Sequence, residues 1–363
     1  MKILFICSSI NSELLNIVDA LKLYEIEVDI LDIVSYEFLY HSGKKIYIRP
    51  KSKYKSLEYF FILDEINEYH RRREIFDYLN RYDSVHIYKA CYFAKDFKDK
   101  IESISLRYII TPNDVLLKSS LKLDRLFSDS NGFLFFDEFI RSKYRKLYGY
   151  EFINQVLHPP VRALKNFDDI DSEIYEEFIN YLQIDLNKTN IFCMFSGSKI
   201  KQKDLLIKLV NLPIEIKQRS TFILYFKDED DEFTKRMLLF LKDMKLDYIV
   251  LGKKVQKEQV LMSIKSSRAS IFIDSSIYNE FLLVSLYSKK HIFLFEPKEI
   301  DEVFKKGKFF MDDFKQFYFF FKEDDINRSL YQEILKRNKE QIKSLFHPES
   351  FSEKYLNFLV ERK

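Results

Sequence analysis

Polar side chains that follow apolar segments are the first candidates for chemistry in this sequence. Segment 106–114 is typical of a strand, and Asn113 and Asp114 form its end. Open α/β sheets bind ligands at the carboxyl ends of their strands, so we predict that Asp114 contacts a ligand. His86 lies inside another strand-like segment, 82–90. A histidine within a buried strand is more often a hydrogen-bonded core residue than a base, and we interpret His86 in that way.

The cysteines and histidines show no metal-binding pattern. Cys7, Cys91 and Cys193 are far apart, no CxxC pair occurs, and no His/Cys/Asp cluster has the spacing of a metal site. Scattered cysteines of this kind indicate buried thiols in a reducing compartment. We therefore expect no metal.

Segment 41–61, "HSGKKIYIRPKSKYKSLEYFF", is basic and aromatic. Its basic residues precede its first acid, Glu58, and tyrosines lie between them: Lys44, Lys45, Arg49, Lys51, Lys53, Lys55, Tyr47, Tyr54 and Tyr59. Basic and aromatic residues together suit a membrane surface. The alternative is a solvated basic loop. Segment 141–148, "RSKYRKLY", could extend the same face.

Composition and charge restrict the class of protein. The chain has 363 residues, of which 47% are hydrophobic and 32% charged, which is typical of a folded chain with two domains. With 59 Lys+Arg and 56 Asp+Glu, the net charge is only +3, which argues against a nucleic-acid partner. No apolar run is long enough for a transmembrane helix, and "MKILFICSSI" does not resemble a signal peptide. We expect a cytoplasmic protein.

Strand-like and helix-like segments alternate along the first half. Segment 2–7 is a short apolar run, a helical pattern with Ser12 as its cap follows, and segment 26–33 alternates like a strand. Strand, helix and strand in this order predict parallel pairing with a right-handed crossover. Strands at 82–90 and 106–114 continue the series, and segment 132–149 predicts a strand and then a helix that ends at Gly149.

The second half repeats this alternation. A polar, acidic connector and helix span about residues 166–185. Apolar segments typical of strands then alternate with amphipathic helical segments, and the strands are expected at 190–198, 220–226, 247–252, 269–276 and 291–297. Two further helical stretches close the chain.

The pair Pro159-Pro160 separates the two series. Proline fixes its own φ and restricts the residue before it, so two in a row make a stiff, extended break. We predict a domain at 1–160, a second at 161–345 and a C-terminal helix at 346–363. Two parallel α/β domains that face each other would form a deep cleft for a ligand.

Several segments resemble the GT-B glycosyltransferases of the retaining glycosyl transferases group 1 family, in the family's order. They are "YDSVHIYKA", "ITPND", "VLHPPVRALKNF", "IFCMFSGSKIKQKD", "DYIVLGKKVQKEQVLMSIKSSRASIFIDSS" and "SSIYNEFLLVSLYSKKHIFLF". The resemblance spans nearly the whole chain, and it identifies the double proline as the turn between domains. It implies an α/β GT-B fold with two facing Rossmann-like domains, parallel sheets, and a C-terminal helix that packs back on the N-terminal domain.

The resemblance also implies a site for the donor phosphates. The family transfers a sugar from a nucleotide diphosphate-sugar with retention of configuration, and charge develops on the leaving diphosphate. Alignment places Gly197 at the family's glycine and Lys203 at its lysine, where a cation suits a diphosphate. The family's arginine falls on Ser198, and Lys199 could replace it. The family's next glycine is Asp204 here.

The resemblance is weaker at the family's paired glutamates, which contact the donor sugar and ribose. From Ser276, the ungapped match places Asn279 at the first glutamate and Tyr287 at the second. A shift of one residue places Glu280, the only carboxylate nearby, at the first glutamate instead. The alternative interpretation is that Glu280 is simply an exposed residue at a helix N-terminus, where the dipole favours an acid.

Two other expectations come from the resemblance. Gly252 takes the place of a glycine on the nucleotide side. The family's glycines after the first strand are replaced here by Ser8, Ser9 and Asn11, whose side chains could donate or accept hydrogen bonds.

The functional expectation is a glycosyltransferase of the hexosyltransferase class, with Asp114 and Glu280 as catalytic candidates and no cofactor. Its partners would be a nucleotide-sugar donor and a glycan, lipid-linked or protein acceptor. Segment 41–61 would bind the inner face of the membrane. Two alternatives stay open: a GT-B protein that has lost catalysis and serves as a binding or assembly subunit, and an epimerase-like GT-B enzyme, whose signature histidines and glutamates are not visible.

Overall fold

The computed structural model divides the chain into two compact units. Unit 1 consists of Met1–Pro160 and Pro348–Lys363, and unit 2 is Val161–His347. The residues that the structure describes are 1–7, 10–32, 38–41, 44–47, 82–89, 107–112, 132–136, 138–148, 154–196, 198–226, 231–244, 246–252, 255–273, 279–295, 309, 311–321 and 325–360.

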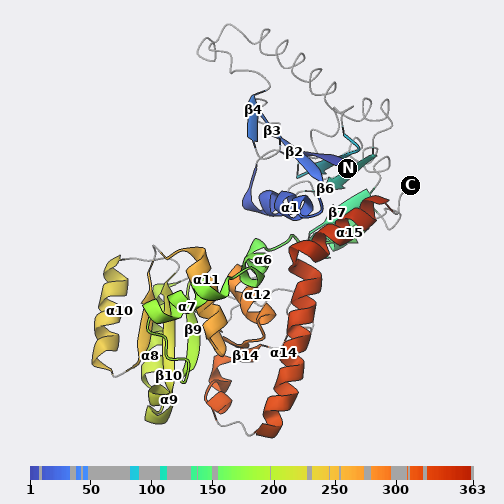
Figure 1. The fold of residues 1–363 in the computed structure, drawn as a ribbon. Coiled ribbons are helices and arrows are strands. Elements are labelled where there is room, and N and C mark those ends of the chain that lie inside the picture. The colour runs from blue at the N-terminus through green and yellow to red at the C-terminus, as the bar shows by residue number, and fades with distance from the viewer. Residues whose placement is uncertain are drawn as a thin grey trace. The chain divides into compact units, whose positions relative to one another are not determined.

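Unit 1 is built on a sheet with the strand order β4-β3-β2-β1-β5-β6-β7-β8 (Figure 1). The bounds are β1 Lys2–Cys7, β2 Glu27–Asp32, β3 Phe38–His41, β4 Lys44–Tyr47, β5 Ser84–Tyr88, β6 Arg107–Thr111, β7 Gly132–Phe135 and β8 Asn154–Val156. Strands β1, β2, β5, β6 and β7 pair in parallel, as predicted, and β8, which the sequence analysis did not anticipate, pairs in parallel with β7. Strands β3 and β4 pair antiparallel at one edge, which the sequence analysis did not anticipate.

Helix α1 (Ser12–Lys22) follows β1 and forms the predicted crossover to β2. Its N-cap is Asn11 rather than Ser12, because the Asn11 side chain accepts a hydrogen bond from the Leu14 N–H. Its buried residues, which include Leu14, Ile17 and Leu21, recur at helical spacing and face the sheet. Helix α5 (Glu138–Tyr148) follows β7, and Gly149 lies outside the described residues.

The C-terminal helix α15 (Pro348–Val360) belongs to unit 1, so the prediction that it packs back on the N-terminal domain is confirmed. Its buried side chains Phe351, Tyr355 and Phe358 join the core formed by β1 and α1. The Tyr24 hydroxyl also donates a hydrogen bond to the Glu349 carbonyl at 3.3 Å.

Unit 2 is built on a second parallel sheet with the strand order β11-β10-β9-β12-β13-β14. Its strands are β9 Thr189–Phe195, β10 Ser220–Phe226, β11 Tyr248–Leu251, β12 Ala269–Phe272, β13 His291–Leu294 and β14 Asp312–Asp313. Its helices are α6 Arg162–Asp168, α7 Ser172–Tyr181, α8 Lys199–Val210, α9 Ile214–Arg219, α10 Asp231–Asp243, α11 Lys257–Ser266, α12 Glu280–Tyr287 and α14 Asp325–Phe346, with 3₁₀ turns η1 Phe314–Gln316 and η2 Phe319–Phe321.

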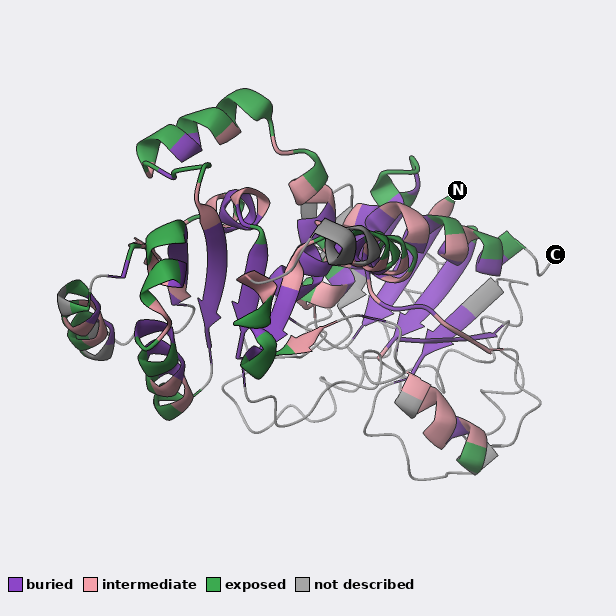
Figure 2. Ribbon diagram, turned by 90° about the horizontal axis from the view of Figure 1, so that it is seen from below, coloured by how far each residue is buried: buried purple, intermediate pink, exposed green. Residues whose placement is uncertain are grey.

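Both faces of the unit 2 sheet are covered, and its strands β9, β10 and β12 are almost entirely buried (Figure 2). Alternate residues of β9 point to opposite faces: Ile191 and Cys193 join the core under α8 and α10, whereas Phe192 and Met194 join the core under α6, α7, α11, α12 and α14. Burial on both faces explains why these strands are continuous apolar runs in the sequence. Helix α6 was not anticipated, because the sequence analysis assigned its residues to the domain break and an acidic connector.

Within the described part of the chain, no helix combines the length and apolar character needed to cross a membrane.

Candidate functional site

The strand order of unit 2 reverses between β9 and β12. The chain runs from β9 to β10 and β11 on one side, then returns to β12 on the other side of β9. In open parallel sheets, ligands bind at the carboxyl ends of the strands where the chain order reverses in this way. Helices α8 and α12 begin directly after β9 and β12, so both N-termini lie at this edge.

The N-terminus of α8 combines a polar cap with nearby lysines. Ser198 is its N-cap, and its Oγ accepts a hydrogen bond from the Lys201 N–H at 3.4 Å. Two lysines at or near the start of the helix, Lys199 and Lys203, have exposed side chains, and the first turn contains no acid. Unpaired N–H groups, the helix dipole and two cations all favour a phosphate here.

Ser196, the residue after β9, adds a buried polar group at this edge. The residue is 4% exposed, and its hydroxyl has no hydrogen-bond partner among the described residues. An unpartnered buried hydroxyl costs free energy, so a ligand that bonded with it would be favoured. The sequence analysis missed Ser196, although its place beside Gly197 at a strand end was a usable signal.

Asn279, predicted to contact the donor sugar, caps α12. Its Oδ1 accepts a hydrogen bond from the Leu282 N–H at 3.2 Å, and its Nδ2 donates to the Met194 sulfur at 3.5 Å. The residue is only 3% exposed. Its amide therefore links α12 to β9, and its contact with a sugar stays a prediction.

Glu280, the first residue of α12, forms an ion pair with the first residue of α11. Its Oε2 lies 2.5 Å from the Lys257 Nζ, and about a third of each side chain is exposed. An acid in the first turn is also favoured by the helix dipole. The carboxylate is thus at the carboxyl edge of the sheet, and its catalytic role stays a prediction.

Tyr287 lies at the other end of α12 from Asn279, about 12 Å along the helix axis. Its hydroxyl donates to the Asp168 Oδ2 at 2.7 Å, and its ring stacks on His347 with centroids 5.9 Å apart. The Lys339 Nζ lies 4.6 Å from the ring centroid. The structure therefore does not bring Tyr287 to Asn279, and the observed contacts of Tyr287 join α12 to α6 and α14.

A pocket of about 300 Å³ lies beside Gly252, at the carboxyl end of β11. Phe178 from α7, Leu182 at its C-cap and Val255, before α11, are apolar, while Tyr181 adds a phenol and Gln259 an amide. This composition, mostly apolar with two polar side chains, suits an organic ring. Gly252 was predicted from the sequence to lie on the nucleotide side, and its role there stays a prediction.

Unit 1 has an equivalent reversal between β1 and β5, and polar residues gather there. The Tyr88 hydroxyl hydrogen-bonds to the Glu13 carboxylate and lies 3.4 Å from the Asn11 Oδ1. The Lys89 Nζ lies 2.8 Å from the Glu13 Oε1. Burial, with a further contribution from Glu13, raises the pKa of Tyr88, so the phenol stays protonated as the donor.

Lys89 in this cluster has a φ of 52°, in the left-handed region. That conformation is unfavourable for a residue other than glycine, and strained residues concentrate at functional sites. Of the four residues in the cluster, the sequence analysis had singled out only Asn11. The position of Tyr88 and Lys89 at a strand end could have indicated them as site residues. Their pairing with Glu13 could not be predicted, because it depends on the strand order.

Other candidates fall outside the described residues. They are Gly197, Ser276 and Asp114, and also Ser8, Ser9 and Asn113. Most of segment 41–61 also lies there, and the side chains of its strand β4 are not described. Within the described part of the chain, no three His, Cys, Asp or Glu side chains are grouped to hold a metal ion.

Solved structures of low sequence identity share this architecture. HepE from Anabaena in complex with UDP aligns with a TM-score of 0.57 and 10% identity, over 99% of this chain and 100% of that chain. A glycosyltransferase from Rickettsia africae aligns with a TM-score of 0.58 and 14% identity, over 99% of this chain and 98% of that chain.

A third similar structure is UDP-GlcNAc 2-epimerase from Neisseria meningitidis bound to UDP-GlcNAc. It aligns with a TM-score of 0.62 and 10% identity, over 99% of this chain and 100% of that chain. No protein-family profile and no curated protein sequence matches this chain.

The fold is therefore GT-B, with two Rossmann-like units, as the sequence predicted. At these identities the likeness concerns the fold alone. Glycosyltransferases and epimerases both occur among the similar structures, so the reaction must be argued from the site.

Proposed function

We propose that this protein is a glycosyltransferase that moves a sugar from a nucleotide diphosphate-sugar to a glycan, lipid-linked or protein acceptor, with retention of configuration. The observation that carries the proposal is the N-terminus of α8. Its cap Ser198 and the exposed Lys199 and Lys203 lie where the strand order of unit 2 reverses. That position suits a diphosphate.

The chemistry follows from the charge of the leaving group. As the bond from sugar to phosphate breaks, negative charge accumulates on the diphosphate. Fixed N–H groups at the start of α8 and the ammonium of Lys203 would stabilise that charge, and Lys199 would replace the family's arginine. Because these groups would interact with the diphosphate more strongly in the transition state than in the bound substrate, they would accelerate transfer.

The pocket beside Gly252 would hold the base of the nucleotide. Strand β11 is separated from β9 by β10 alone, so their carboxyl ends are about 10 Å apart. A ribose can span such a distance between a base in the pocket and a diphosphate at α8. Phe178 and Val255 would provide the apolar walls and Gln259 the hydrogen-bonding edge.

The polar cluster of unit 1 would contact the acceptor. Glu13, Tyr88 and Lys89 lie at the carboxyl edge of that sheet, and the side chains of Glu13 and Lys89 are partly exposed. A carboxylate and an ammonium suit the hydroxyl groups of a glycan. Four expectations from the sequence remain predictions. They are contact of Asp114 with the acceptor, contact of 41–61 with the inner face of a membrane, a cytoplasmic location and the absence of a cofactor.

A second candidate function is supported by a specific observation. In the ungapped register, the two positions of the family's glutamates hold Asn279, which caps α12, and Tyr287, which bonds Asp168. Both observed sets of contacts are structural. Structural residues at both glutamate positions are expected of a GT-B protein that has lost catalysis and acts as a binding or assembly subunit.

Thermal-shift measurements with UDP, GDP, ADP and CMP test the proposed donor site. We expect one nucleotide to raise the melting temperature, since a ligand that binds only the folded state stabilises it. Lys203→Ala should remove most of the shift. Lys208→Ala, an exposed lysine in the last turn of the same helix, is the matched control and should keep it.

The outcome separates the candidate functions. An equal shift in Lys203→Ala and Lys208→Ala would contradict the proposed phosphate site, and no shift with any nucleotide would favour the second candidate. Slow hydrolysis of the matching nucleotide-sugar would establish activity. Conversion to an isomeric nucleotide-sugar without an acceptor would identify an epimerase instead.

A further inference from the structure

Unit 2 has a second cavity, of about 410 Å³, at the outer edge of its sheet. His291 and Asp312, the first residues of β13 and β14, contribute to its wall. The side chains of Gln316, Phe319 and Phe320 come from η1 and η2, and Tyr331 comes from α14.

This cavity is distinct from the proposed donor site. His291 begins β13, whereas the N-termini of α8 and α12 lie at the carboxyl ends of the strands. Asp312 pairs with Phe293, nearer the carboxyl end of β13, so the separation rests on strand order. Strand β14 lies three strands from β9, about 14 Å across the sheet. The pocket beside Gly252 lies at β11, the opposite outer strand of the sheet, and it shares no described lining residue with this cavity.

The walls of the cavity are aromatic, but they do not form a flat slot. The His291 ring is tilted by 60° from Phe320 at a centroid distance of 4.8 Å, and by 55° from Tyr331 at 5.1 Å. Phe319 is 61% exposed, which is unusual for phenylalanine in a folded protein. Inclined rings suit a puckered ring that presents C–H groups, whereas a planar base requires parallel faces.

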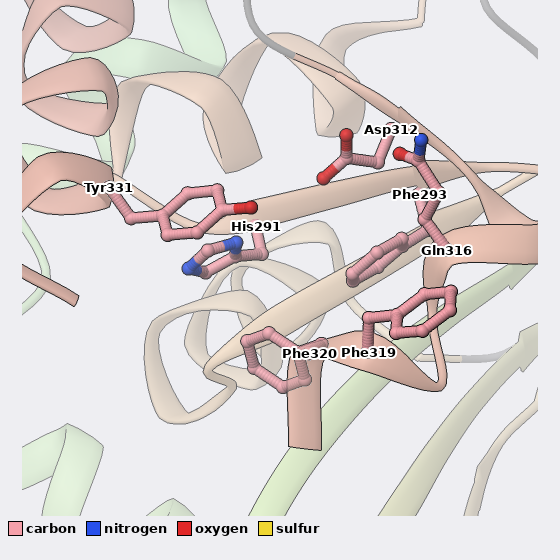
Figure 3. A pocket seen from close by; sticks show the side chains of 7 residues that line it. All are labelled: His291, Phe293, Asp312, Gln316, Phe319, Phe320 and Tyr331. Atoms are coloured by element: carbon pink, nitrogen blue, oxygen red, sulfur yellow. The ribbon is translucent and has the colours of Figure 1, made fainter. Parts of the chain in front are cut away.

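The polar groups of the cavity suit hydroxyl groups. Figure 3 shows the Asp312 carboxylate and the Tyr331 hydroxyl pointing toward the same space, with the Gln316 amide beside Asp312. Burial, with a contribution from Arg268, lowers the pKa of His291 to about 4, so its imidazole is neutral near pH 7. Neutral imidazole, amide and phenol groups can each donate and accept a hydrogen bond, as sugar hydroxyls require.

The described lining of the cavity carries negative rather than positive charge. No lysine or arginine lines the cavity in the described part of the chain, and Asp312 would repel a phosphate. A cavity of this size is at the small end for ligand sites, which suits a sugar residue rather than a whole nucleotide.

We propose that this cavity is a carbohydrate-binding site for a neutral pyranose residue, separate from the donor site. The ring of the sugar packs on Phe320 and Phe319. Its hydroxyl groups bond to Asp312, Gln316 and Tyr331. The proposal does not depend on glycosyl transfer, because a binding or assembly subunit could use the same site.

Titration of the full chain with methyl glycosides of glucose, galactose and N-acetylglucosamine tests the site, by ligand-observed NMR and calorimetry. At least one glycoside should bind, and Asp312→Asn should weaken it about tenfold or more, because a charge-assisted hydrogen bond is lost. Tyr331→Phe should weaken it several-fold.

Matched variants control for general effects. Asp169→Asn removes a carboxylate of unit 2 outside the cavity, and Tyr318→Phe removes a nearby phenol that does not line it. Both should bind the glycoside normally. Lys203→Ala should also bind it normally while losing the nucleotide shift, so failure of the donor site and failure of this site are distinguishable.

Three results would overturn the proposal. One is the absence of binding by any glycoside. Another is binding that Asp312→Asn and Tyr331→Phe leave unchanged. The third is tighter binding of choline, an organic cation that aromatic walls and a carboxylate can also hold, than of every glycoside tested.

Discussion

His86 shows how a single side chain is neutralised by its surroundings. It is 0% exposed in the middle of β5, as expected for a core histidine. Its Nδ1 lies 3.1 Å from the Tyr355 hydroxyl and its Nε2 lies 2.7 Å from the Thr111 hydroxyl. Burial lowers the pKa of His86 from 6.5 to about 3, so the imidazole is neutral and joins β5, β6 and α15.

This pKa predicts a pH-dependent stability. Between about pH 6.5 and pH 3 the unfolded chain binds a proton at His86 that the folded chain does not, so the free energy of unfolding falls as the pH decreases. Above pH 6.5 the residue adds no pH dependence. Well below 6.5 the slope is about 1.4 kcal/mol per pH unit.

Urea unfolding at about pH 7.5 and about pH 5.5 measures this effect. His86→Gln keeps hydrogen-bonding groups but cannot titrate in this range, so it should lose less stability than the wild type on acidification. The same loss in both proteins would show that His86 is not the titrating group.

At the scale of elements, helix N-termini determine which side chains reach the carboxyl edge of the unit 2 sheet. Ser198 caps α8 and lies exposed, whereas Asn279 caps α12 and lies buried against Met194. The two caps make similar local hydrogen bonds, yet only the first leaves its polar group open to a ligand. Burial by neighbouring strands, rather than residue type, makes this difference.

The capping role of Asn279 predicts the effect of its removal. Asn279→Ala should lower the free energy of unfolding by about 1 kcal/mol, and Asn279→Ser should lower it much less, because serine restores the cap. Chemical denaturation measures both. If Asn279→Ala kept full stability but lost the nucleotide-induced shift, Asn279 would be a ligand contact instead.

At the scale of the molecule, the chain crosses between its units twice. It leaves unit 1 after Pro160 and returns at Pro348 with α15. The side chains of Phe351, Tyr355 and Phe358 are at most 3% exposed, so α15 completes the core of unit 1. Loss of α15 would expose apolar surface on β1 and α1 to water, which is unfavourable.

Deletion of Pro348–Lys363 should therefore destabilise unit 1 selectively. Hydrogen exchange followed by mass spectrometry should show faster exchange in β1 and β5, with little change in β9 and β10, whose core contains no residue of α15. The full chain is the control. Equal protection of β1 with and without α15 would contradict this role.

The sequence by itself determined most of the elements and their order. Segment 2–7 and most later strands were found because strands buried on both faces must be continuous apolar runs, and α1 was found from its apolar spacing. Two departures have local causes. The cap of α1 is Asn11 because its side chain reaches the Leu14 N–H. Of the antiparallel pair, β4 lies in the basic stretch 41–61 and β3 ends where that stretch begins, and neither was predicted as a strand.

Only the tertiary structure decided which residues meet. The pairing of Glu13 with Tyr88 and Lys89 joins positions 75 and 76 residues apart, and the cavity of His291 joins two strands, two 3₁₀ turns and a helix. The two glutamate positions were considered together from their spacing, but an eight-residue helix places Asn279 and Tyr287 at opposite ends. Local periodicity records which face of an element is buried, whereas contacts between distant elements depend on strand order and packing, which no short stretch of sequence contains.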